Sequence, residues 1–465
     1  MTVLLPKDPK GPMATGARGH ARALLTLGLP LVGSNVAQIM MAMADTLMLG
    51  WYDVTALAAS TLAVSLWILL FLLGAGFSNA VMTLVAAALE EDDAVTVRRV
   101  TRMGLWLSLL FALPCLPLFW WSEPLFLAMG QEPDVAALAQ DYLRIHGFSM
   151  FPAMAIMALR AILTATEHTR IILWGTIVAA LLNAGLNWVL IFGNLGFPEL
   201  GIRGAAIATL ILQIAGALLF AVYALVRMPE YDLFTRLWKP DWPIFARVFR
   251  LGVPIGLTTL AEAGLFNVSA VMMGWIGKVP LAAHGIVMEL TSMAFMIHLG
   301  FSQAATVRAG RAYGRRDEAQ LRSGATVALA ITGGLVAISM CLFLLLPAPL
   351  VGLFVDPDDP LRDQILATGV TLLAVAALFQ AADAAQVMTV GLLRGVQDTS
   401  VPMVIAIVTY WGIGLPAGYL FAFTFGMGAI GVWLGMALGL MSAAVALSWR
   451  FWRNTRRFAT RPLVA

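Results

Sequence analysis

The stretch LAASTLAVSLWILLFLLGAGFSNAVMTLVAAA, residues 57–88, decides the fold. It contains no charged residue in 32 positions, and the nearest charges on either side are Asp53 and Glu90. An α-helix needs about 20 apolar residues to cross the hydrocarbon core of a bilayer. This stretch therefore predicts a membrane-spanning helix with residues to spare at its ends.

The rest of the chain repeats this pattern. Of its 465 residues 60% are hydrophobic and 12% are charged, whereas a soluble domain carries about 25% charged residues. The excess apolar surface has to face lipid, so we expect an all-α polytopic membrane protein. Turn and breaker residues separate twelve predicted spans, at about residues 23–50, 57–88, 101–121, 140–163, 170–193, 203–227, 250–276, 281–307, 323–347, 365–393, 400–425 and 428–450.

Positive charge predicts the orientation. With the N-terminus inside, the inner segments hold 25 Lys and Arg residues, Arg160 and Arg394 among them, and the outer loops hold three. Cytoplasmic loops are the ones enriched in Lys and Arg. We therefore expect cytoplasmic tails at 1–22 and 451–465 and a cytoplasmic linker at 228–249. The run after the first tail is too long for a secretory signal.

The two halves of the chain are similar when shifted by 224 residues. Over residues 27–98 this shift gives 19 identities in 72 positions without a gap, and it places Leu27-Gly28-Leu29-Pro30 on Leu251-Gly252-Val253-Pro254. Each half has six predicted spans, so the repeat is parallel, with an axis along the membrane normal. We expect two pseudo-symmetric lobes, residues 23–227 and 250–450, with a solute site between them. Such a repeat favours a transporter over a channel.

Four acidic residues are predicted to lie well inside spans: Asp45, Glu262, Glu289 and Asp383. A carboxylate in the bilayer costs about 2.5–3.5 kcal/mol on insertion scales, so such residues are usually functional. Bound Na⁺, H⁺ or a cationic substrate could supply the counter-charge. A structural acid between helices is the alternative.

Prolines and histidines in the spans are open to two interpretations. Pro30 and Pro254 occupy equivalent positions of the repeat, and each is either a static kink or a bend that changes during the cycle. His284 and His298 lie beside Glu289 on one predicted helix and could relay protons, although packing is the favoured role for them.

Several sequence runs together resemble the MATE (multidrug and toxic compound extrusion) family, in particular its bacterial NorM branch. The resemblance covers about residues 20–450. Its markers include Ala44-Asp45-Thr46, the run Leu182-Asn183-Ala184-Gly185-Leu186-Asn187-Trp188, Pro198-Glu199-Leu200-Gly201-Ile202-Arg203-Gly204, Leu281-Ala282-Ala283-His284, and Gly391-Leu392-Leu393-Arg394-Gly395-Val396-Gln397-Asp398-Thr399.

The resemblance implies a two-lobed, V-shaped antiporter of the bacterial inner membrane. It would expel small organic cations as Na⁺ or H⁺ enters, and it would be a lipid-embedded monomer. In the second lobe Glu262 and Asp383 match acids of the NorM branch, Phe379 stands where a relative has Tyr, and Glu289 stands where Asn is expected. In the first lobe, the positions matching a cation site are Asp45, Asn183, Asn187, Ala205 (through its carbonyl) and Thr209.

The coupling ion stays open between Na⁺ and H⁺. Asp45, Asn183, Asn187 and Thr209 are oxygen donors from three helices and favour Na⁺, whereas a proton needs only the carboxylate. Some relatives carry an acid where Asn187 stands, which removes one charge here.

Two other function classes fit the sequence less well than a cation-coupled exporter. A lipid-linked-sugar flippase of the same superfold would need a cationic cavity for pyrophosphate. It is disfavoured, because the sequence places no Lys or Arg mid-span apart from the possible edge residues Arg144 and Arg160. A membrane enzyme is disfavoured, because no phosphate loop, metal-ligand spacing or Ser–His–Asp set is present. Cys115 and Cys341 show neither zinc spacing nor a disulfide framework. We expect no cofactor besides the coupling cation, and no nucleic-acid partner.

Overall fold

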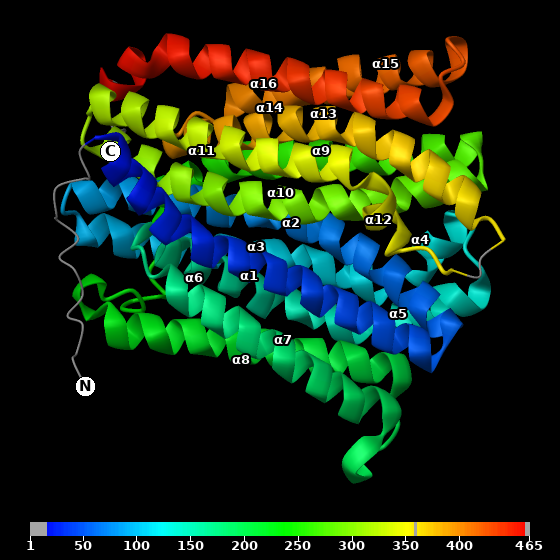
Figure 1. The fold of residues 1–465 in the computed structure, drawn as a ribbon. Helices are drawn as coiled ribbons and strands as arrows, with labels where there is room; N and C mark the ends of the chain where they lie inside the picture. The colour runs from blue at the N-terminus through cyan, green and yellow to red at the C-terminus, as the bar shows by residue number, and fades with distance from the viewer. Residues whose placement is uncertain (1–15, 358–359, 461–465) are drawn as a thin grey trace, which may run out of the picture. The chain divides into compact units, whose positions relative to one another are not determined.

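The computed structural model describes residues 16–357 and 360–460, which fold into helices joined by short connections (Figure 1). In this part of the chain twelve segments are long and apolar enough to cross a membrane, which confirms the twelve predicted spans. Residues 1–15 and 461–465, which belong to the predicted tails, lie outside the described residues.

The helices form two compact units. We name residues 33–256 the N-terminal unit; the C-terminal unit comprises the chain up to Val32 and from Leu257 onward. Helices α1 (Ala17–Tyr52) and α9 (Trp242–Ile276) contribute to both units. The N-terminal unit also contains α2 (Val54–Glu90), α3 (Ala94–Trp120), α4 (Glu123–Ala128), α5 (Pro133–His146), α6 (Met150–Ala165), α7 (Thr169–Phe192) and α8 (Gly201–Arg227).

Long helices run side by side in the C-terminal unit (Figure 1). Helix α13 packs against α10, α11 and α16. The eleventh span, Ser400–Thr424, alternates between α-helix and two π-helical segments, Val408–Gly414 and Leu420–Thr424. The α-helices of this unit are α10 (Lys278–Gly314), α11 (Glu318–Leu345), α12 (Pro347–Gly352), α13 (Arg362–Gly395), α14 (Ser400–Ile407), α15 (Leu415–Tyr419) and α16 (Gly428–Thr460).

The 224-residue repeat is visible in how the units divide. The division falls after Val32 in α1 and after Gly256 in α9, which are equivalent positions of the repeat. The first part of α1 therefore packs in the C-terminal unit, and the first part of α9 packs in the N-terminal unit. Helix caps repeat as well: Asp93 and Asp317 each accept a hydrogen bond from the backbone N–H three residues later, which satisfies an otherwise unpaired donor.

Glycines let these exchanged segments approach their neighbours closely. A Cβ placed on Gly76 of α2 would lie 2.3 Å from the carbonyl oxygen of Gly252 and 2.5 Å from the backbone nitrogen of Gly256. At the equivalent crossing in the C-terminal unit, a Cβ on Gly300 of α10 would lie 2.7 Å from the backbone nitrogen of Val32. Any larger side chain would push the helices apart, as at the small-residue interfaces of other membrane helices.

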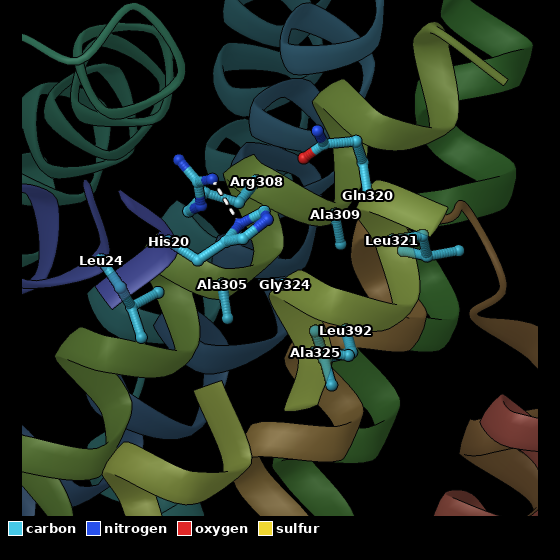
Figure 2. A pocket seen from close by; sticks show the side chains of 10 residues that line it. All are labelled: His20, Leu24, Ala305, Arg308, Ala309, Gln320, Leu321, Gly324, Ala325 and Leu392. Carbon is cyan, nitrogen blue, oxygen red and sulfur yellow. Dashed lines mark hydrogen bonds between the residues drawn. The ribbon is translucent and has the colours of Figure 1, made fainter. Parts of the chain in front are cut away.

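The beginning of α1 is also held by His20, which is 2% exposed (Figure 2). Arg308 of α10 donates from Nη2 to His20 Nδ1 over 2.8 Å. A guanidinium cannot accept a hydrogen bond, so Nδ1 carries no proton and the neutral ring is protonated at Nε2. That nitrogen then donates to Ser323 Oγ of α11 over 3.0 Å.

Two arginines that the sequence counts with the inner segments lie within helices near their ends. Arg160 lies inside α6 and is 8% exposed, and Arg394 lies in the last turn of α13. Helices also extend beyond the predicted spans, since α9 begins at Trp242 and α16 continues to Thr460. The physical reason is that hydropathy marks the lipid-crossing length of a helix, whereas backbone hydrogen bonds continue wherever neighbouring helices cover polar side chains.

Candidate functional site

Asp45 of the N-terminal unit accepts a hydrogen bond from Asn187, one of two neighbouring asparagines of α7. Asn187 donates from Nδ2 to Asp45 Oδ1 over 2.5 Å and to Asn183 Oδ1 over 3.3 Å. The two asparagines are four residues apart, so they share one face of α7, and both are 0% exposed. Leu181 on the same helix is 71% exposed. The structure thus assembles three of the four residues of the predicted sodium cage.

Free polar atoms remain in this group. Asn187 Oδ1 and Asn183 Nδ2 are buried and have no hydrogen-bond partner among the described residues. A free amide oxygen beside a carboxylate fits a hard cation, which prefers carboxylate and carbonyl oxygens. Across the described ranges no group of three or more His, Cys, Asp or Glu could hold a metal ion. A cation here would have to rely on amide, hydroxyl and carbonyl oxygens around single acids.

Ala205 and Thr209 of α8 bond to each other. Thr209 donates from Oγ1 to the Ala205 carbonyl over 3.1 Å. Thr209 and Asn183 line the same cavity, of about 70 Å³. The described contacts do not include one between Thr209 and Asp45, so the fourth cage position stays a prediction. Tyr142 of α5, which sequence reasoning missed, does interact electrostatically with Asp45.

The acids of the C-terminal unit form a closer group. Glu262 of α9 and Asp383 of α13 are near enough to interact electrostatically. Asp383 is 2% exposed. Glu262 Oε1 and Asp383 Oδ1 are buried and lack a hydrogen-bond donor among the described side chains and backbone. Buried polar groups without partners are rare and costly, so each carboxylate oxygen is available to a proton or a cation.

Two residues that the sequence did not assign to this site, Arg394 and Tyr410, interact with its acids. Arg394 interacts electrostatically with Glu262 and donates from Nη2 to Thr259 Oγ1 over 3.5 Å. Tyr410, 0% exposed, interacts with both acids. It lies in the first π-helical segment, and such segments are frequent at functional sites. With both acids ionised and Arg394 protonated, the group carries one net negative charge.

Helix α13 presents further polar groups on the same face. Gln380 is 0% exposed and Gln386 is 1% exposed, and both have buried amide atoms without partners among the described residues. Their spacing of three residues on either side of Asp383 was a signal available in the sequence. A polar residue at every third position of an apolar span indicates one buried polar stripe.

The other predicted residues of this half surround the acids less directly. Phe379 packs edge-on against Trp433 with ring centroids 5.3 Å apart, and His284 packs against the same Trp433 at 5.6 Å. The Nδ1 atom of His284 is buried without a hydrogen-bond partner among the described residues, so the packing role that the sequence favours for it stays a prediction. Glu289 is half-buried on α10, and no hydrogen bond or ion pair joins it to Glu262 or Asp383 in the described structure.

Pro30 and Pro254 lie inside α1 and α9, and both helices continue through them. Each proline is two residues before the division between the units, at Val32 and Gly256. Whether they bend during a cycle stays a prediction. His298, 1% exposed, has a buried Nδ1 without a described partner, and its role also stays open.

Comparison with known proteins agrees with this architecture. The family model MatE matches residues 30–189 and again residues 254–420. The two matches begin at Pro30 and Pro254, 224 residues apart, as the internal repeat requires.

Bacterial relatives are similar over nearly the whole chain. A protein of Rhizobium meliloti is 45% identical over 446 residues, covering 95% of each chain, and one of Agrobacterium fabrum is 40% identical over 434 residues, covering 93% of each. Both are called "Probable multidrug resistance protein NorM".

Solved structures share the fold at lower identity. A MOP superfamily transporter from Pyrococcus furiosus is 22% identical with a TM-score of 0.86, covering 97% of this chain and 100% of the other. A eukaryotic MATE transporter is 19% identical with a TM-score of 0.84, covering 95% and 98%. The two-lobed, twelve-span fold predicted from the sequence is thereby confirmed. The chain belongs to the MATE family of membrane transporters and is a transporter, not an enzyme.

Proposed function

We propose that this protein exports small organic cations in exchange for Na⁺ or H⁺ by alternating access. The moving bodies are the two six-helix lobes predicted from the repeat, residues 23–227 and 250–450, joined by the linker 228–249. Support for the substrate class comes from the relatives, which are named as multidrug resistance proteins. No cofactor beyond the coupling cation is needed. The cation moves down its own gradient and drives export of the solute, and this exchange forms and breaks no covalent bond.

The observation that carries the proposal is the group formed by Glu262, Asp383 and Arg394. When both acids are ionised and Arg394 is protonated, the group has a net charge of minus one, and two of its carboxylate oxygens lack donors in the described structure. One proton or one monovalent cation then neutralises the group. A cationic drug supplies the same charge. Proton and drug then compete for this site, and competition between two ligands is the minimum that exchange requires.

Asp45 provides a second coupling position. Its asparagine partners and Thr209 offer neutral oxygens, and such ligands favour Na⁺ over a proton. We propose that Asp45 binds Na⁺, with Asn183, Asn187, Thr209 and the Ala205 carbonyl as candidate ligands, while Glu262 and Asp383 take the proton or the drug. Phe379 and Glu289 remain candidate drug contacts.

The proposed setting is the bacterial inner membrane, with both tails and the linker in the cytoplasm, and with a single copy of the chain surrounded by lipid. The distribution of Lys and Arg supports this orientation.

A lipid-linked-sugar flippase is the weaker alternative. The structure does place Arg160 on a cavity wall, but that cavity holds about 70 Å³ and is lined by one arginine. A pyrophosphate would need several positive charges.

Binding of ethidium to the purified protein tests the proposal. Sodium is titrated at fixed pH, and pH is then varied at fixed sodium. We expect sodium to lower ethidium affinity by about 5-fold or more, the lower end of typical coupling between sites. If pH alone shifts the affinity and sodium does nothing at any pH, the protein is a proton antiporter and the sodium cage is wrong. Efflux from vesicles under an imposed Na⁺ or pH gradient provides the matching transport measurement, and empty vesicles provide its control.

A further inference from the structure

The last helix, α16, changes from an apolar surface to a positively charged one near its end. Residues 428–449 contain no charged side chain. The arginines that follow are Arg450, Arg453, Arg456 and Arg457. The chain has no acidic residue after Asp398. The change falls at the end of the predicted span 428–450, where Trp and Arg side chains of membrane helices meet lipid headgroups.

Two of these arginines have acidic partners. Arg450 donates from Nε to Asp398 Oδ2 over 2.6 Å, and Arg456 Nε lies 3.8 Å from Glu318 Oε2. Arg453, by contrast, is exposed, and no acid of the described residues pairs with it. Its positive charge is therefore left without a counter-charge from the described part of the protein.

The side chain of Arg453 leans back along the helix toward the bilayer. Its guanidinium carbon lies 4.8 Å from the centre of the Trp449 ring, one turn earlier. Side chains on a helix tilt toward its N-terminus, and at this end of α16 that direction leads into the lipid. An arginine near a bilayer usually extends its charge toward water, whereas Arg453 holds its charge at the edge of the apolar surface.

An apolar groove begins at the same tryptophan. It holds about 510 Å³ and is lined by Met441, Ser442, Val445, Ala446 and Trp449. Met441, Val445 and Trp449 are spaced by four residues, so each is the surface neighbour of the next, and they are 37%, 63% and 62% exposed. On a membrane-spanning helix such a surface faces lipid acyl chains. The Arg453 guanidinium therefore lies at the headgroup end of an acyl-chain groove.

A second groove of the same unit lacks such a charge. It holds about 470 Å³ and is lined by Ala337, Ile338, Cys341, Leu342, Leu345 and Leu346 of α11. Residues 323–355 contain no charged side chain, so this segment offers an acyl chain a surface but offers a headgroup no ion pair. On α16 a guanidinium is present, and its paired N–H donors match phosphate oxygens.

The headgroup that fits the α16 groove is anionic. A zwitterionic phospholipid such as phosphatidylcholine brings an ammonium group together with its phosphate. The chain after Asp398 has no acid to bind that ammonium, and the Trp449 ring, whose face attracts cations, already carries Arg453. An anionic phospholipid such as phosphatidylglycerol brings the phosphate without a cation.

We propose that the α16 groove and the Arg453 guanidinium together form a binding site for an anionic phospholipid. One acyl chain lies along Met441, Val445 and Trp449, and the phosphate accepts hydrogen bonds from Arg453. The site uses none of the acids of the candidate functional site. It goes beyond the proposed export function and does not depend on it.

Mass spectrometry of the intact protein measures this binding, because each bound lipid adds a known mass. Delipidated protein in detergent is titrated with dioleoyl phosphatidylglycerol and, separately, with dioleoyl phosphatidylcholine, which share acyl chains and differ in headgroup. We expect wild type to bind phosphatidylglycerol about fivefold more tightly, the effect of one arginine near an anionic lipid surface. Arg453→Gln should lower the phosphatidylglycerol affinity about fivefold and change the phosphatidylcholine affinity less than about twofold.

Two further variants locate the effect within the site. Arg453→Lys keeps the charge without the planar fork, so its phosphatidylglycerol affinity should lie between those of wild type and Arg453→Gln. Trp449→Leu keeps the groove apolar but removes the ring that holds the guanidinium, and should also weaken the preference for phosphatidylglycerol. These two variants carry the test if Arg453→Gln does not fold.

The matched control is Arg227→Gln. Arg227 is an exposed arginine in the last turn of the membrane-spanning helix α8, and Val222 and Val226 before it are also exposed. The aromatic residue one turn earlier, Tyr223, packs against His168. Removing this charge should change both lipid affinities less than about twofold.

Equal affinity of wild type for the two lipids would overturn the inference. An equal loss of phosphatidylglycerol affinity in Arg453→Gln and Arg227→Gln would also overturn it, because diffuse positive charge would then explain the binding. A wild-type protein that appears as two copies without bound phosphatidylglycerol would contradict it as well, since the α16 face would then have a second copy of the chain as its occupant.

Discussion

The two units keep their buried acids in different ways. In the N-terminal unit Asp45 is a single acid that accepts a hydrogen bond from Asn187, which also binds Asn183. In the C-terminal unit Glu262 and Asp383 interact with each other, and each has a buried oxygen without a donor in the described structure. The repeat supplies a shared scaffold, but the residue equivalent to Asp45 is Ser269 and the residue equivalent to Glu262 is Gln38.

This difference teaches what each site is prepared to bind. The Asp45 carboxylate already accepts a hydrogen bond from an amide, and neutral oxygens lie beside it. In the proposed function this arrangement favours a metal cation over a proton. Two neighbouring acids repel each other until a proton, an arginine or a cationic ligand intervenes. Arg394 provides part of that compensation through its interaction with Glu262, and in the proposed exchange the transported proton or drug provides the rest.

Neutralising an acid of the C-terminal unit should have the largest effect. We expect Asp383→Asn, and separately Glu262→Gln, to reduce gradient-driven ethidium efflux to the rate of empty vesicles. Each change removes a buried charge without removing volume, so the melting temperature of the purified protein should not fall greatly. Wild-type efflux in either variant would contradict the assignment. A variant that no longer elutes as a single folded species would point to a structural role.

Neutralising the acid of the N-terminal unit should abolish the response to sodium while leaving drug binding in place. We expect ethidium affinity in Asp45→Asn to be the same with and without sodium, whereas wild type should change by about 5-fold or more. Isothermal titration with ethidium at several sodium concentrations measures this. Thr46→Ala, beside it on the exposed side of α1, is a matched control that should keep the sodium response. A sodium response that survives in Asp45→Asn would move the cation site elsewhere.

Gly76 and Gly28 should differ in how strongly they resist an added methyl group. Gly76→Ala in α2 meets backbone atoms of Gly252 and Gly256, whereas Gly28→Ala in α1 meets the ring of Phe301, its nearest carbon 2.5 Å away. A ring can rotate and a backbone cannot, so Gly76→Ala should cost about 1–3 kcal/mol of stability and Gly28→Ala less. Thermal unfolding in detergent compares them. Gly185→Ala, with nothing within 4 Å of the new carbon, is the control. Equal losses of stability in Gly76→Ala and Gly28→Ala would show that the Phe301 ring is as fixed as the backbone.

The smallest expected effect is a pH dependence in the N-terminal unit. Asp241 binds Arg99 and Arg102 of α3 just before α9 begins, and the hydrogen bond with Arg99 lowers the pKa of the Asp241 carboxyl. A lowered folded-state pKa gives stability that is present above the unfolded value, about 3.9, and is lost as the pH falls through the folded value. Because Arg99 is partly exposed, the contribution should be less than about 1 kcal/mol.

The measurement is the melting temperature of wild type and Asp241→Asn between neutral and acidic pH. The difference between them should be largest near neutral pH and should shrink below about pH 4. The control is Asp232→Asn, which removes an exposed partner 3.7 Å from Arg98 and should leave the melting temperature nearly unchanged throughout. A difference for Asp241→Asn that does not vary with pH would rule out the ion pair as its cause.

Hydropathy and self-similarity determined the fold from the sequence alone. Twelve spans, an all-α class and two equivalent halves follow from patterns that are local along the chain or separated by one fixed shift. The same local patterns located four acids in the spans, because any charge stands out in an apolar run. The stripe of Gln380, Asp383 and Gln386 on α13 was also readable, since helical spacing defines a face without any partner.

Only the tertiary structure decided which of these residues meet. Asn187 and Asp45 are 142 residues apart, and Arg160 and Ser34 are 126 residues apart; each contact depends on how two helices are rotated and where they cross. The sequence places Arg160 and Arg394 at the inner ends of predicted spans and does not indicate their partners. The tertiary structure supplies those partners, the Ser34 hydroxyl for Arg160 and the Glu262 carboxylate for Arg394. Hydropathy estimates the free-energy cost of placing a charge in lipid. Only the fold determines whether that charge contacts lipid or polar side chains of neighbouring helices.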